Sequence, residues 1–218
     1  MALVNQVNIA CGGHAGDSQS MLHSLQIAND YNCELGAHPS YPDRKNFGRQ
    51  SLNISPAKLR DSLLDQINTL ADIAAKLGCQ LSHIKAHGAL YNDMVKNAEL
   101  CEQVLSVFAE FDQSCAVMLP QIAIIQLPRQ TQPIIYEGFI DRAYDEKGHL
   151  VPRAQAGAVL SGVVAFKQAK QMIDSGTVTS QCGQLLSMPI DTLCVHGDSP
   201  EALGIAQQVK AYLNQDAK

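Results

Sequence analysis

The sequence predicts an α/β fold in which short parallel strands alternate with longer helices. Apolar runs of strand length are separated by segments whose apolar residues recur at helical spacing, and this alternation continues to the C-terminus. The 218 residues are 46% hydrophobic and 17% charged, which is typical of a globular chain that can bury a sizeable core. We find no low-complexity segment, interdomain linker or fixed-period repeat, so we expect a single domain over residues 1–218.

Six apolar runs are predicted strands, because each is short and is followed by glycine, proline or polar residues. A further apolar patch near Leu185 is ambiguous. The predicted strands are Val7 to Ala10, Glu34 to Ala37, His83 to Ala86, Ala116 to Leu119, Ile134 to Ile140 and Thr192 to Val195.

Helices are predicted between these strands. Asp17 or Ser18 is a candidate N-cap, and Ser55 followed by Pro56 is the N-cap and first turn of a long helix that Gly78 ends. The expected helices cover about residues 18–28, 56–77, 98–111, 161–174 and 202–213, with a doubtful pair of turns at 122–127.

Charge and composition exclude several functional classes. The net charge of −5 and the lack of a Lys/Arg run argue against nucleic acid. No apolar stretch reaches the roughly 18–20 residues that span a bilayer, and no signal peptide is recognisable, so we expect a cytoplasmic protein without membrane contact. Seven cysteines without a CxxC pair predict reduced thiols. P-loop, GxGxxG and GxSxG motifs are missing from the sequence.

Polar residues that can do chemistry follow the predicted strands, where parallel α/β folds build their active sites. Four histidines recur at this position in separate units. Neutral imidazoles gathered at one edge of a sheet suit either a metal ion or proton transfer. These histidines are His14, His38, His87 and His196.

Lys85 is predicted inside an apolar strand, and a buried ammonium needs a partner. Glu137 or Asp141 is the expected partner. The lysine then either fixes the strands through a buried ion pair or serves as a substrate-binding or acid/base residue.

Other charged residues near strand ends have two possible roles. Asp17, Asp43 and Asp198 are either helix and turn caps or functional groups, and Asp198 with His196 is a candidate functional pair. Arg142 lies beside a long loop, where it could bind a carboxylate or phosphate.

Five segments in order along the chain resemble the LamB/YcsF family, whose members are the A subunits of 5-oxoprolinases. They are NIACGGHAGD, GAHPSYPDRKNFGR, HIKAHGALYN, EGFIDRAYDEKGHLVPR and CVHGD, and the resemblance extends from about Val7 to Leu213. It implies a seven-stranded-type (β/α) barrel resembling the glycoside hydrolase/deacetylase barrel. The family's first strand unit, with an acidic D-x-N-x-D-x-G-E motif, has no match here, so we expect a barrel that lacks this unit.

The resemblance also implies an activity. The chain would be the A subunit of an ATP-dependent 5-oxoprolinase that opens the lactam ring of 5-oxo-L-proline to L-glutamate, with subunits B and C as partners, ATP as co-substrate and a divalent metal as a candidate cofactor. Two alternatives stay open: a metal-dependent deacetylase or amidohydrolase that acts alone, and an inactive, truncated scaffold protein.

Site residues follow from the family's motif positions. The candidate catalytic residues are His14, His38, His87, Lys85 and Asp17. The candidate substrate-binding residues are Asn92, Glu137, Arg142, His196 and Asp198, and the same resemblance offers His14, His38 and His87 as metal ligands.

Overall fold

The computed structural model describes residues 2–121 and 132–214. By their internal contacts these residues form two compact units. The first contains residues 2–118 and 132–134, and the second contains residues 119–121 and 135–214. The predicted turns at 122–127 lie outside the described residues, and a single domain over 1–218 stays a prediction.

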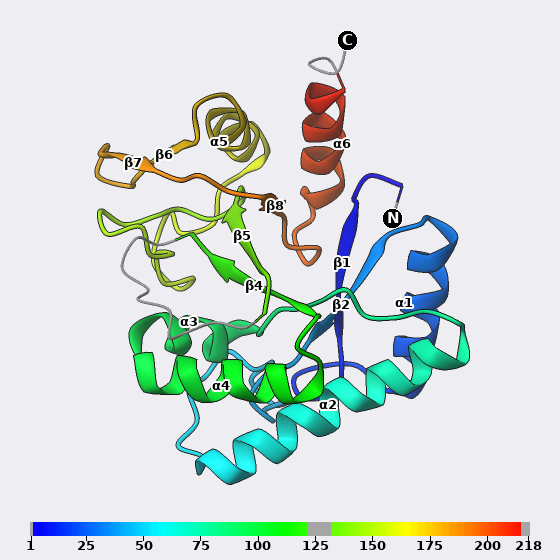
Figure 1. The fold of residues 1–218 in the computed structure, drawn as a ribbon. Helices are drawn as coiled ribbons and strands as arrows, with labels where there is room; N and C mark the ends of the chain where they lie inside the picture. The colour runs from blue at the N-terminus through cyan, green and yellow to red at the C-terminus, as the bar shows by residue number, and fades with distance from the viewer. Residues whose placement is uncertain (1, 122–131, 215–218) are drawn as a thin grey trace. The chain divides into compact units, whose positions relative to one another are not determined.

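Parallel strands form the sheet of the first unit (Figure 1). Neighbouring strands follow chain order, as crossover helices between consecutive parallel strands require. The strands are β1 (Gln6–Ala10), β2 (Glu34–His38), β3 (His83–Ile84) and β4 (Ala116–Pro120).

Helices follow the strands of this unit, and α2 packs against both α1 and α4. Leu63, Ile67 and Leu70 line the fully buried face of α2, where the predicted helical spacing places them. Pro56 is the first residue of α2, and Asp17 caps α1, as predicted. The helices are α1 (Ser18–Asp30), α2 (Pro56–Lys76), α3 (Gly88–Lys96) and α4 (Ala98–Phe111).

His83 is a structural residue inside the first unit. Its ring lies where a side chain at Gly36 of the neighbouring strand would otherwise be. Its Nε2 is 3.2 Å from Asn8 Oδ1, and its Nδ1 is 2.8 Å from Ser82 Oγ. The fully buried imidazole is thus hydrogen-bonded at both nitrogens, as a buried polar group requires.

The second unit contains a parallel pair of strands and an antiparallel hairpin (Figure 1). Residues near Leu185, which are ambiguous in the sequence, form one strand of that hairpin. Helix α5 packs against α6 and against β6. The elements are β5 (Ile134–Phe139), α5 (Gly162–Ser175), β6 (Thr177–Thr179), β7 (Leu185–Ser187), β8 (Thr192–Cys194) and α6 (Ala202–Leu213).

The predicted α/β class and the parallel strand pairs are confirmed, whereas α3 was not predicted. This helix is nine residues long and begins at Gly88, one residue after His87. The cysteines of the described residues are reduced thiols. Among the described residues, no helix combines the length and apolar character needed to cross a membrane.

Candidate functional site

Three of the four predicted histidines meet in the first unit. His14 follows β1, His38 is the last residue of β2, and His87 follows β3. The rings of His14 and His87 stack with centroids 3.7 Å apart and planes 8° apart, and the ring of His38 stands edge-on to both. Phe47 packs its ring edge-on against His14 and His87. The expectation that strand ends bring these histidines together is therefore met.

Hydrogen bonds fix two of the three rings. His38 Nδ1 is 2.7 Å from the carbonyl oxygen of Lys85, and His38 Nε2 is 3.1 Å from His87 Nδ1. His87 Nε2 is 2.9 Å from the carbonyl oxygen of Phe47. His14 differs, because its buried Nδ1 has no hydrogen-bond partner in the part of the chain that the structure describes.

Loss of hydration and nearby positive charge keep two of the rings neutral. Burial, together with the charges of His87, Arg49 and Arg44, lowers the pKa of His14 to about 3. Burial also lowers the pKa of His38 well below its usual value, and the charge of Lys85 acts in the same direction. Neutral imidazoles can accept protons and hydrogen bonds at neutral pH.

A buried glutamine holds the loop that follows β2. Gln66 on α2 accepts a hydrogen bond from the backbone N–H of Ser40 at 3.0 Å and donates to the carbonyl of Ser40 at 2.9 Å. The same amide fills the space beside Gly13 that a side chain there would occupy. One side chain thus contacts both the loop that carries His14 and the loop that follows His38.

Glycines bring the 41–49 loop against the histidines. Gly48 has a φ of +63°, and a Cβ there would be 2.9 Å from the Cβ of His14 and 3.0 Å from Cδ2 of His87. The carbonyl of Gly48 accepts the backbone N–H of Ala89 at 2.9 Å, next to Gly88 with its φ of +60°. Only residues without a side chain fit this close approach.

The three histidines do not fit the metal site that the resemblance implies. Both nitrogens of His38 and of His87 face a carbonyl oxygen or another ring, so they do not converge on one ion. Among the residues with described positions, no group of three or more His, Cys, Asp or Glu side chains is arranged to hold a metal. We therefore derive no chemical step through a metal.

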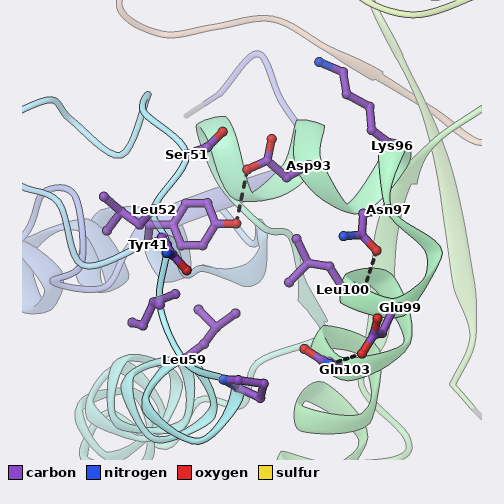
Figure 2. Close-up of a pocket in the computed structure, with 13 residues that line it drawn as sticks. Tyr41, Ser51, Leu52, Leu59, Asp93, Lys96, Asn97, Glu99, Leu100 and Gln103 are labelled. Carbon is purple, nitrogen blue, oxygen red and sulfur yellow. Dashed lines mark hydrogen bonds between the residues drawn. The ribbon is translucent and has the colours of Figure 1, made fainter.

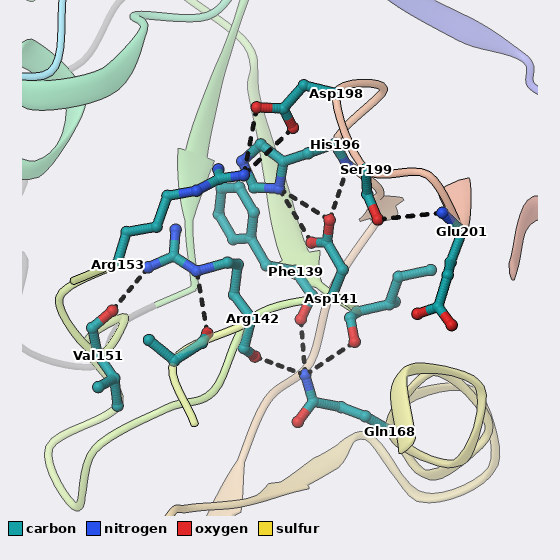
Figure 3. Close-up of polar contacts among 12 residues, drawn as sticks. Phe139, Asp141, Arg142, Val151, Arg153, Gln168, His196, Asp198, Ser199 and Glu201 are labelled. Atoms are coloured by element: carbon teal, nitrogen blue, oxygen red, sulfur yellow. Dashed lines mark hydrogen bonds and ion pairs between the residues drawn. The ribbon is translucent and has the colours of Figure 1, made fainter. Parts of the chain in front are cut away.

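His196, the fourth histidine, forms a pair with Asp141 in the second unit (Figure 3). The ring Nδ1 is 3.0 Å from both carboxylate oxygens, and the backbone N–H of His196 donates to Oδ2 at 2.9 Å. Asp141 is 2% exposed, and the ring of Phe139 stacks on the imidazole. Because the carboxylate accepts at Nδ1, the unprotonated Nε2 is left available for a proton.

Burial alone would raise the pKa of Asp141, but the hydrogen bonds and charge of His196 outweigh it and lower the pKa. Asp141 therefore stays ionised at neutral pH and stabilises a positive charge on the imidazole. A carboxylate that orients a histidine and stabilises its imidazolium is an arrangement that can support proton transfer.

Comparison with known sequences places this architecture in a family. The sequence profile of the LamB/YcsF family matches residues 1–218. The chain belongs to the LamB/YcsF family.

Relatives match this LamB/YcsF chain over nearly its full length. The A subunit of a 5-oxoprolinase from Pyrococcus abyssi is 36% identical over 219 residues, which is 99% of this chain and 86% of that protein. The corresponding 5-oxoprolinase protein from Methylococcus capsulatus is 39% identical over 218 residues, 98% of this chain and 83% of the relative.

A solved structure confirms the fold class of this LamB/YcsF chain. It is the crystal structure of a lactam utilization protein from Thermus thermophilus, with a TM-score of 0.87 and 29% sequence identity. The match covers 99% of this chain and 87% of that chain.

Three further residues expected from the family's motifs lie in the first unit. Asp17 accepts from Ser20 as the N-cap of α1, and Asn92 is exposed on α3. Lys85 is 5% exposed, with its ammonium 5.8 Å from the ring centroid of Tyr91. The predicted pairing of Lys85 with Glu137 or Asp141 stays a prediction.

In the second unit of this LamB/YcsF chain, the candidate pairing of Asp198 with His196 stays a prediction. Arg153 pairs with Asp198 at 3.2 Å, whereas His196 hydrogen-bonds to Asp141 (Figure 3). The Asp141 partner of His196 is distant from it in the chain and lies just after β5.

Arg142 and Glu137 are both buried in the second unit. Arg142 donates from Nε to the carbonyl of Ala158 at 3.1 Å and from Nη2 to that of Val151 at 2.6 Å, which holds the long loop (Figure 3). Glu137 is 1% exposed on β5. Substrate binding by these two residues stays a prediction.

A cavity of about 380 Å³ in the first unit is separate from the histidines. Tyr41 and Asp93 meet at its wall with their side chains 3.1 Å apart, and Leu52, Leu59 and Leu100 supply apolar surface (Figure 2). None of the predicted site residues lines this cavity. It is therefore not the site that the motifs of the LamB/YcsF family indicate.

Some residues of the two sites carry little sequence signal. Phe47 contributes a ring and a carbonyl to the histidine cluster, but no pattern in the loop indicates this role. Gln66 is one polar residue on the apolar face of a helix, and that break in the pattern is the signal that could have found it.

Proposed function

We propose that this chain is the A subunit of an ATP-dependent 5-oxoprolinase that opens 5-oxo-L-proline to L-glutamate together with subunits B and C. The observation that carries this proposal is the match of the whole chain to the LamB/YcsF family and to relatives named as 5-oxoprolinase A subunits. The likeness to a lactam utilization protein supports the same class of substrate. Because the relatives' name designates one lettered component of an enzyme, it also supports action within a complex of several proteins.

The chemistry of a lactam explains the need for ATP. An amide carbon is a poor electrophile, and transfer of the γ-phosphoryl group of ATP to the amide oxygen would turn that oxygen into part of a leaving group. Water then attacks the ring carbon, the C–N bond breaks and the ring nitrogen takes up a proton, which leaves an acyl phosphate. A second water attacks the acyl carbon and displaces phosphate, which gives the carboxylate. The reaction therefore needs a group that orients water and groups that move protons.

The first unit supplies neutral imidazoles for orienting water. The Nδ1 of His14 has no hydrogen-bond partner among the described residues, and the rings of His14 and His87 stack after β1 and β3, the two strands that flank β2. A base with a pKa near 3 is weak, because proton transfer is most effective near the working pH. An anionic substrate or phosphoryl group would offset the positive charges around His14 and thereby raise its basicity.

The second unit supplies the Asp141–His196 pair, in which a buried carboxylate stabilises the imidazolium. We assign proton transfer to His196 and the positioning of its ring to Asp141. Both assignments can be tested by substitution without reference to the other unit.

The deciding experiment mixes the chain with subunits B and C and measures 5-oxoproline-dependent release of glutamate and ADP. His87→Ala should abolish turnover while the circular dichroism spectrum stays unchanged. His23→Ala, on the exposed surface of α1, is the matched control and should retain turnover. Hydrolysis of an amide by the chain alone, with metal but without ATP, would instead support an independent amidohydrolase. Complex formation without turnover would support a scaffold.

A further inference from the structure

The hydrogen bonds around His38 and His87 determine how many N–H groups the two rings carry. A carbonyl oxygen can only accept, so His38 Nδ1 must carry a hydrogen to bond to Lys85 at 2.7 Å. For the same reason His87 Nε2 must carry a hydrogen to bond to Phe47 at 2.9 Å. A neutral imidazole has only one N–H. If both rings were neutral, their other nitrogens would each present a lone pair.

Those two other nitrogens, His38 Nε2 and His87 Nδ1, are 3.1 Å apart. Two lone pairs at this distance repel each other, whereas an N–H donating to a nitrogen forms a hydrogen bond of normal length. We propose that His38 and His87 share one excess proton and form a singly charged imidazole–imidazolium pair, in place of the metal site that the resemblance to the LamB/YcsF family implies.

The surrounding groups place the charge on His87. The pKa of His38 is held well below its usual range by loss of hydration and by the charges of Lys85, His87 and His14. The neighbours of His14, in turn, include Arg44 and Arg49 in addition to His87. His38 therefore acts as the acceptor in the pair. The stacked ring of His14 is the neutral partner of a cation, and face-to-face contact of a cation with an aromatic ring is favourable.

This protonation pattern gives the two stacked rings different roles. His87 is a fixed cation whose two N–H groups are both engaged, and His14 is the ring that can accept a hydrogen bond or proton. A cation in this position attracts an anionic group such as a carboxylate or phosphate. Use of that charge in lactam opening rests on the proposed function, whereas the protonation itself does not.

Nitrogen NMR of the full chain tests the proposal directly. Long-range proton–nitrogen spectra of the histidine-labelled protein distinguish neutral rings of either tautomer from doubly protonated rings. At neutral pH we expect one doubly protonated ring, assigned to His87, and a neutral His38 with its hydrogen on Nδ1. His87→Gln identifies the signal, and His23→Gln serves as the control that leaves it in place.

A second variant tests the reason for the excess proton. In His38→Gln, the new side-chain amide can donate to Nδ1 of a neutral His87, so the doubly protonated signal should disappear at neutral pH. Two neutral rings in the unmodified protein would overturn the proposal. So would a doubly protonated His87 that persists in His38→Gln, or a stoichiometric Zn²⁺ that shifts the nitrogens of all three histidines. Because the first spectrum needs no variant, the proposal remains testable if His38→Gln does not fold.

Discussion

His14 and His87 stack face to face with their ring centroids 3.7 Å apart, although 72 positions of the chain separate them. The contact depends on the backbone around it, because Gly48 lies against both side chains. Changes in the supporting loops should therefore affect turnover even where no functional group is removed.

Gly48→Ala should lower both stability and turnover. The new methyl group would be 2.9 Å from His14 Cβ and 3.0 Å from His87 Cδ2, at a φ of +63°. Gly78→Ala is the matched control, since Gly78 has a similar φ of +71° but open space around it. We expect the control to lose about 1–2 kcal/mol of unfolding free energy through the backbone alone, with normal turnover. Denaturant unfolding measures the stability of the two variants, and glutamate release measures their turnover. Equal losses in Gly48→Ala and Gly78→Ala would refute the packing argument.

Asp141→Asn should reduce turnover by about 100-fold or more, because an amide neither stabilises the imidazolium nor selects the productive tautomer of His196. The pH dependence of turnover should change as well, which a purely structural role would not cause. Asp174→Asn, on the exposed side of α5, is the control and should retain turnover and its pH profile. Normal turnover in Asp141→Asn would exclude the pair from the reaction.

Gln66→Leu should destabilise the chain by about 2 kcal/mol or more, because the amide and carbonyl of Ser40 would lose their partner in a buried place. Chemical denaturation provides the measurement. Gln80→Leu, at an exposed position after α2, is the comparison and should change stability little. A loss no greater than that of Gln80→Leu would show that the loop finds other partners.

Acid should weaken the fold partly through His14. Its pKa is about 3 in the folded chain and near 6.5 when unfolded, so the unfolded state binds the extra proton between these values. The stabilising contribution is complete above about pH 6.5 and is lost as the pH falls toward 3, by at most about 1.4 kcal/mol per pH unit. His14→Gln should flatten the dependence of unfolding free energy on pH between about 6.5 and 5. An unchanged slope would mean that His14 keeps an ordinary pKa.

Periodicity and strand-end chemistry predicted much of this molecule. The spacing of Leu63, Ile67 and Leu70 identified α2, and the position of His14, His38 and His87 after successive strands predicted their meeting. Those patterns are local or follow from the parallel arrangement of strands, so a single sequence contains them.

The hydrogen-bond partners of His196, His38 and His87 could not be predicted in the same way. Asp141 is 55 positions from His196, and the nearer Asp198 is the more obvious partner in the sequence. Likewise, the orientation of the His38 and His87 rings depends on the backbone carbonyls of Lys85 and Phe47. Every residue has a carbonyl, so residue identity does not reveal which one a ring will bond to.

The side chains of Gln66 and Gln168 hold loops through backbone atoms. Gln66 contacts the backbone of Ser40, and Gln168 donates to the carbonyls of Phe139, Ile140 and Arg142 (Figure 3). Main-chain atoms are the same whatever side chains the loops carry. Loop positions other than the closely packed glycines can therefore be substituted, by evolution or by design, while the two helices continue to hold the loop backbones in place.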